Sequence, residues 1–84
     1  FPNPFNPTTT IRYDLPNEED VSIVIFDVVG RKIRSLINQN QSAGYYRIQW
    51  DAKNDLGEPV SAGMYIYILH AGDHRSVKKM VLLK

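Results

Sequence analysis

The stretch Tyr45-Tyr46-Arg47-Ile48-Gln49-Trp50-Asp51 decides the fold class, because its side chains alternate in character along the chain. In an extended strand, successive residues point to opposite faces. Tyr46, Ile48 and Trp50 therefore share one face, and the residues between them share the other. We predict a strand over residues 45–51 that places the single tryptophan of the chain in a hydrophobic core.

The same period of two continues on both sides of this stretch, and no segment keeps an apolar stripe over three helical turns. Turn-forming residues separate the alternating segments, among them Gly30 and the pair Gly72-Asp73. The predicted strands are 9–15, 21–27, 32–37, 45–51, a short strand near Val60, 64–71 and 74–83. This pattern predicts an all-β protein, an Ig-like antiparallel β-sandwich of about seven strands.

Three of these segments carry further local predictions. Ile33 and Leu36 are three residues apart, which breaks the alternation within 32–37 and indicates a β-bulge or a twist. The polar run 38–44 predicts a loop. Within 21–27 we expect Ser22 and Val24 to face away from the core.

Composition excludes several function classes. A chain of 84 residues with 43% hydrophobic residues forms one folded domain with a thin core. No apolar run in the chain approaches the roughly 20 residues that cross a bilayer, so no membrane insertion is expected. A formal net charge of +1 predicts no general attraction to nucleic acid. The absence of cysteine excludes a disulfide, a thiolate nucleophile and a cysteine-based metal site.

The first eight residues are rich in proline and differ from the rest of the chain. Proline excludes a helix here and favours extended backbone. No basic flank followed by an apolar stretch is present, so the segment is not a signal peptide. We predict that residues 1–8 form the boundary with a linker of a longer chain, and that residues 9–84 form the domain.

Few residues of the sequence are of the kinds that catalyse reactions or bind metals. His70 and His74 flank the Gly72-Asp73 turn, and a zinc site usually needs three or four protein ligands, so we interpret them as exposed turn-flanking residues. The loop 51–58 contains oxygen ligands suited to calcium, but Lys53 takes the third position of the EF-hand pattern. All nine acids fall in turns or on outward strand positions, so no desolvated carboxylate pair is expected. We predict a non-enzymatic domain without metal or cofactor.

Four stretches taken together carry a resemblance to a known family. They are Pro2-Asn3-Pro4-Phe5-Asn6-Pro7-Thr8-Thr9; Phe26-Asp27-Val28-Val29-Gly30-Arg31; Trp50-Asp51 with Asp55-Leu56-Gly57 and Gly63-Met64-Tyr65; and Lys79-Met80-Val81-Leu82-Leu83-Lys84. Their order and spacing resemble the type A C-terminal sorting domains of the type IX secretion system, Ig-like domains that end many secreted proteins of the Bacteroidetes and related phyla. The middle portion is also similar to the Ig-like domain of the flagellar hook-capping protein.

The resemblance implies a function in secretion. It implies that the domain follows an N-terminal cargo domain and is recognised by an outer-membrane secretion translocon and a sortase-like peptidase. The cargo would then be secreted or held at the cell surface, after passing the periplasm and outer membrane of a Gram-negative bacterium. The implied recognition residues are Gly72, Lys78, Lys79, Met80, Val81, Leu82, Leu83 and Lys84, and the implied linker boundary is Pro2, Asn3 and Pro4.

The residues themselves add a physical reason for this role. A last strand with one apolar face and one basic face is held in a sheet and still presents charge to a receptor. If that strand lies at a sheet edge, a partner strand can add to it. We expect the domain to act as a monomer.

Two alternatives remain open. The first is a structural or adhesive Ig-like accessory module that spaces or stabilises a neighbouring domain of a secreted enzyme. The second is a carbohydrate-binding module, which needs at least two aromatic side chains exposed on one surface. Tyr45 is the one tyrosine that we predict to point clearly outward.

Overall fold

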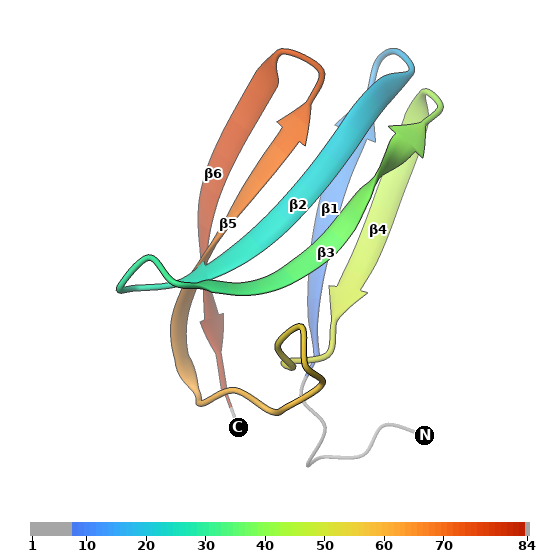
Figure 1. Cartoon of the computed structure of the whole chain (residues 1–84). Coiled ribbons are helices and arrows are strands. Elements are labelled where there is room, and N and C mark those ends of the chain that lie inside the picture. The colour runs from blue at the N-terminus through green and yellow to red at the C-terminus, as the bar shows by residue number, and fades with distance from the viewer. Residues whose placement is uncertain (1–7, 84) are drawn as a thin grey trace, which may run out of the picture.

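The computed structural model describes residues 8–83, and their strands form two antiparallel sheets (Figure 1). The six strands are β1 (Thr9–Leu15), β2 (Glu19–Asp27), β3 (Lys32–Gln41), β4 (Gly44–Trp50), β5 (Gly63–Ala71) and β6 (His74–Leu82). One sheet pairs β1 with β4, and the other has the order β3-β2-β5-β6. The predicted all-β sandwich is confirmed, with six strands in place of about seven.

Two predictions about individual segments are wrong. The strand expected near Val60 is absent from the described residues, where Lys53 and Pro59 form only an isolated bridge across a tight loop. The loop expected over 38–44 is instead the end of β3, which continues to Gln41 because residues 38–41 pair with the start of β2. A partner strand here outweighs the weak strand preference of asparagine and glutamine.

The predicted bulge lies between β2 and β3. Ile37 pairs with Ile23 and Ser35 pairs with Val24, so Leu36 has no partner of its own. Leu36 and Ile37 both pack, half-buried, against the core although they are neighbours in the chain. The bulge thus explains why the apolar spacing departs from two.

The core consists of two adjoining clusters between the sheets. One gathers Ile11, Leu15, Val21, Ile23, Leu69 and Ala71, and the other gathers Ile25, Trp50, Ala52, Tyr65 and Leu82. As predicted, Trp50 is fully buried, and its ring meets that of Tyr65 edge to face with 5.2 Å between centroids. Its indole N–H donates to the carbonyl of Lys53 at 2.9 Å. The tryptophan therefore joins the end of β4 to the turn that follows it.

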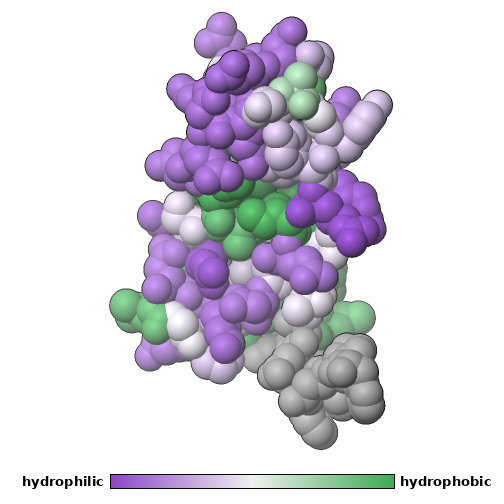
Figure 2. All heavy atoms as spheres, turned by 90° about the vertical axis from the view of Figure 1, so that its right-hand side faces the viewer, coloured by the Kyte–Doolittle hydropathy of each residue, from purple (hydrophilic) through white to green (hydrophobic). Residues whose placement is uncertain are grey.

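Burial decreases toward the outer strands, because a sheet of two strands faces a sheet of four. In Figure 1, β5 and β6 form one flank of the molecule and β3 and β4 the other. Figure 2 views the flank that carries β3 and β4 and shows an apolar band between polar regions. Half-buried residues of these strands include Leu36, Ile37 and Ile48. The sandwich is therefore incompletely closed along its flanks.

The hairpin between β2 and β3 is held by the Asp27 carboxylate. Its Oδ1 accepts hydrogen bonds from the backbone N–H groups of Val29 (3.0 Å) and Arg31 (2.9 Å), and its Oδ2 accepts one from Arg31 Nε (2.8 Å). Gly30 completes the turn with φ of 93°, a backbone conformation that favours glycine. The hydrogen bond from the Arg31 backbone, aided by the guanidinium, lowers the pKa of Asp27.

Replacement of the tryptophan tests the core. We expect Trp50→Phe to lower the free energy of unfolding by about 2 kcal/mol, because it removes buried volume and the hydrogen bond to Lys53. The measurement is urea unfolding followed by far-UV circular dichroism, since the variant lacks the indole fluorophore. Tyr45→Phe, at a side chain that is 93% exposed, is the control and should change stability by less than about 0.5 kcal/mol. Equal effects in the two variants would contradict this account of the core.

Titration of Asp27 tests the hairpin. The amide proton shifts of Val29 and Arg31 should change with a midpoint below the ordinary aspartate value of about 3.9. Because the folded-state pKa is lowered, the carboxylate stabilises the hairpin above the ordinary value, and this contribution disappears as the pH falls through the lowered pKa. Arg31→Ala should move the midpoint upward. A midpoint unchanged by this substitution would show that the guanidinium has no part in the hairpin.

Candidate partner-recognition surface

Strand β6 lies at the edge of the four-stranded sheet. It pairs with β5 over its whole length without a register shift, from Gly63 opposite Leu82 to Ala71 opposite His74. Among residues 8–83, no strand pairs with its other side. An edge strand has unpaired backbone N–H and C=O groups along its free side, to which another strand can bind. Within the described part of the chain, β6 is thus a regular nine-residue strand with one open edge.

The opposite edge of the same sheet, formed by β3, is covered in part by the loop 51–60. The backbone N–H of Asp55 donates to the carbonyl of Ile33 at 3.0 Å, and the N–H of Ser35 donates to Asp55 Oδ1 at 2.9 Å. Arg34 adds an ion pair with Asp51 at 3.1 Å. Between residues 8 and 83, no comparable loop or side chain hydrogen-bonds to β6. Of the two edges, only that of β3 is protected in this way.

The two faces of β6 differ in burial. On the inner face Leu82 is buried and Met80 is half-buried against Tyr65 and its neighbours, so both side chains belong to the core. Lys78 also points to the inner side but is exposed, because it lies beyond the edge of the two-stranded sheet. Lys78 is paired with Tyr67 of β5. Burial raises the pKa of Tyr67, so its phenol remains protonated beside this lysine. The inner face therefore combines anchoring apolar residues with one accessible cation.

The outer face of β6 continues across its neighbours. The register forms the row Val24, Ile68 and Val77, and next to it the row Phe26, Ile66 and Lys79, followed by Met64 opposite Val81. Val77, Val81 and Met64 are between 45% and 58% exposed. The residues of both rows, together with Met64 and Val81, make up what we call the outer apolar face. Sequence alternation places Val24 outward, but only the strand order shows that the rows join.

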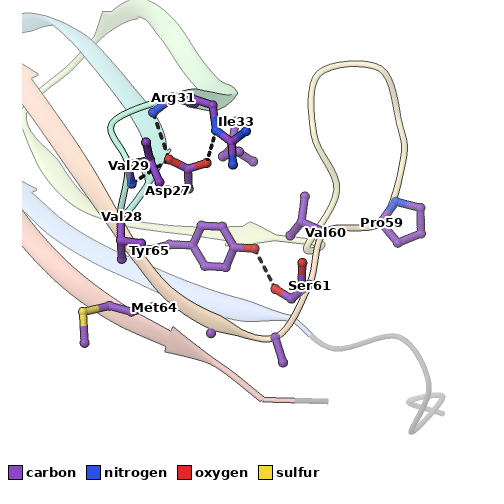
Figure 3. A pocket seen from close by; sticks show the side chains of 12 residues that line it. Asp27, Val28, Val29, Arg31, Ile33, Pro59, Val60, Ser61, Met64 and Tyr65 are labelled. Atoms are coloured by element: carbon purple, nitrogen blue, oxygen red, sulfur yellow. Dashed lines mark hydrogen bonds and ion pairs between the residues drawn. The ribbon is translucent and has the colours of Figure 1, made fainter.

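The β2–β3 hairpin extends this face at one end. Val28 and Val29 at its tip are 63% and 75% exposed, and they adjoin a shallow apolar depression lined by Phe26, Ile66 and Ile68. Figure 3 shows the hollow on the inner side of the same hairpin, between Asp27, Ser61 and Tyr65. Two of its polar side chains are paired within the protein, since Tyr65 donates to the Ser61 carbonyl at 2.6 Å and Asp27 binds its own hairpin. Asp27 and Tyr65 therefore hold the walls of the hollow in place.

Gly72 connects β5 to β6 in a left-handed conformation with φ of 59°. Its N–H donates to the carbonyl of Asp20 at 3.1 Å, and a side chain at this position would collide with the carboxylate of Glu19. The Glu19 side chain can move away, so it is the left-handed backbone that favours glycine in this turn.

The remaining predicted site residues separate into two groups. Lys79, Val81 and Leu83 are exposed with Lys78, whereas Met80 and Leu82 pack in the core. Lys84, Pro2, Asn3 and Pro4 lie outside the described residues. The assignment of all these residues to recognition or to the linker stays a prediction.

The candidate metal ligands have other neighbours. His70 lies across from Arg75, and the described residues contain no group of three histidine or acidic side chains arranged to hold a metal ion. In the loop 51–58, Asn54 Oδ1 accepts hydrogen bonds from the backbone of Leu56 and Glu58, and Asp51 Oδ1 accepts one from Arg34. Within residues 8–83 there is no helix of the length and apolar character needed to cross a membrane.

Three results place the chain among known proteins. The model of the FlgD Ig-like domain family matches residues 6–73. The crystal structure of FlgD from P. aeruginosa is similar with a TM-score of 0.68 and 25% identity, over 89% of this chain and 57% of that one. The crystal structure of dimeric latent PorU from Porphyromonas gingivalis has a TM-score of 0.66 and 23% identity, over 96% of this chain and 8% of PorU.

The extent of these matches differs. The likeness to PorU shows the fold alone, and the chain spans just over half of the FlgD chain and a small part of PorU. No curated protein matches the sequence. The family model, however, covers well over half of the chain and includes β1 to β5. The chain therefore belongs to the FlgD Ig-like domain family.

Proposed function

We propose that this domain is a non-catalytic sorting signal that directs a larger cargo protein through the outer membrane by the type IX secretion system. The observation that carries the proposal is the open edge of β6, a regular strand with exposed lysines, in a sheet whose other edge is covered. The resemblance of the closing segment 79–84 to sorting domains supports it.

The part of the chain that the family model leaves unmatched is consistent with this role. The match to the FlgD Ig-like domain covers residues 6–73 and does not include β6. Leu82 and Met80 attach β6 to the core, while Lys78, Lys79 and Val81 remain exposed on it. A role particular to this chain is therefore best sought on this strand.

Recognition would use the edge and the charges of β6 together. An added strand of the translocon would pair with the free backbone groups, and alternate side chains would give specificity. Lysines on an edge strand discourage unselected pairing, so a partner with acidic side chains at matching positions would be favoured. The outer apolar face offers further contact next to this strand. Removal of the domain by a sortase-like peptidase, before or near Phe1, belongs to the same proposal.

Charge reversal on β6 tests the proposal. We expect Lys78→Glu/Lys79→Glu, fused to a reporter in a host with type IX secretion, to reduce surface delivery about tenfold or more, because acidic partner residues would be repelled. Arg47→Glu/Lys53→Glu makes the same change in net charge at exposed positions away from β6 and is the matched control. Both variants should retain the far-UV circular dichroism of the parent domain.

A second arm removes residues 79–84, which should abolish surface delivery. Because this deletion also removes Leu82 from the core, it is interpreted together with the charge reversal. Normal delivery of the folded charge-reversed variant would overturn the proposed role of the lysines. Normal delivery of the truncated chain would overturn the sorting function.

A structural accessory module is the second candidate function. It is favoured by the occurrence of this fold within longer chains, since the matched region makes up 57% of the FlgD chain. In that case, deletion of the domain would lower the stability of its neighbour and leave secretion unchanged.

A further inference from the structure

The outward face of the two-stranded sheet lies on the other side of the molecule from the outer apolar face. Ile11 and Leu15 of β1 and Trp50 of β4 point inward and are buried. The intervening residues therefore point outward, away from the four-stranded sheet. They are Thr10, Arg12 and Asp14 on β1, and Tyr45, Arg47 and Gln49 on β4. No aliphatic side chain belongs to this face.

Two arginines stand directly opposite each other on it. The register pairs Arg12 with Arg47, and both are exposed. Directly opposed residues have Cβ atoms about 4.5–5.5 Å apart, and like charges at such positions are destabilising. Between residues 8 and 83, neither guanidinium forms an ion pair with an acid, whereas Arg31 and Arg34 both do. The register thus places two cationic side chains next to each other, with Asp14 as the one acid on the same face and no ion pair to either arginine between residues 8 and 83.

The neighbours of this pair supply other recognition chemistry. Tyr45, which is 93% exposed, is opposite Asp14 and two residues from Arg47. A phenol ring presents an apolar body with a polar tip. The Asp14 carboxylate is an acceptor for hydroxyl groups, and the amide of Gln49, opposite Thr10, both donates and accepts hydrogen bonds.

We propose that this face binds a carboxylate-bearing saccharide, such as a uronic acid unit of an acidic polysaccharide. Arg12 and Arg47 bind the carboxylate, for which the guanidinium fork is suited. The Tyr45 ring packs against the C–H face of a sugar ring, and Asp14 and Gln49 bind its hydroxyl groups. Tyr45 is the one aromatic residue of this face, so binding relies on the arginines and the ligand carboxylate, and not on the two exposed aromatic rings of a carbohydrate-binding module. This site is independent of the sorting function and uses none of the residues of β6.

The arrangement favours this ligand over other anions. Nucleic acid binding relies on several phosphate contacts, whereas this face has two cations and one acid. A membrane surface requires apolar side chains, which the face lacks. A carboxylate that stands among neutral hydroxyl groups matches both the paired arginines and the nearby Asp14.

The test is titration of the isotope-labelled domain with trigalacturonate, monitored by amide NMR shifts. Shifts should concentrate at residues 10, 12, 14, 45, 47 and 49. We expect Arg12→Ala and Arg47→Ala each to weaken binding about tenfold or more. Tyr45→Ala should weaken it several-fold. Arg75→Ala removes an exposed cation on β6 and is the matched control, with affinity unchanged.

Two further arms separate a saccharide site from general charge attraction. Asp14→Ala should weaken binding because it removes the hydroxyl acceptor, and tighter binding would overturn the proposal. Maltotriose and inorganic phosphate should cause no comparable shifts at these residues. An absence of trigalacturonate shifts at millimolar concentration, or equal affinity in the arginine variants, would also overturn it.

Discussion

Two strands face four in this domain, and most of its other features follow from that inequality. The core can be dense only where both sheets are present, at Ile11, Ile23, Trp50 and their neighbours. Beyond it, β6 keeps contact with the core through Leu82 and Met80 while most of its other side chains are exposed. A small domain buries a smaller fraction of its surface than a large one, so a strand at its margin can be stable and accessible at the same time.

An accessible edge strand can bind a specific partner, but it can also bind other chains, because its backbone groups are unpaired. The domain treats its two outer edges on the four-stranded sheet differently. At β3, Asp55 contributes both its backbone N–H and its carboxylate in place of a neighbouring strand. At β6, exposed lysines are the only comparable feature within the described part of the chain. This difference supports an interpretation of β6 as a selective acceptor.

The functions that we propose for this molecule lie on its surfaces. Its buried polar side chains are satisfied throughout residues 8–83, and the Asp27 and Tyr65 groups around the hairpin hollow are paired within the protein. Membership of the FlgD Ig-like domain family agrees with a module that serves a longer chain. The outer apolar face and the arginine-bearing face lie on opposite sides, so the two proposed partners need not compete for the same residues.

Alternation along the sequence predicts most of the strands, because it reports which side chains are buried. It also predicts the buried tryptophan, the bulge near Leu36, the Gly30 and Gly72 turns and the two-sheet class. The prediction is wrong at Val60, where turn formers prevail over a short apolar segment, and at residues 38–41, where pairing with β2 extends a polar run as strand. Strand order and register could be read from the tertiary structure alone, since they depend on contacts between residues far apart in the chain. Strand order left β6 with an open edge and joined the apolar rows, and register set Arg12 against Arg47. Alternation reports the face of each side chain, whereas its neighbours across strands are decided by packing of the whole domain.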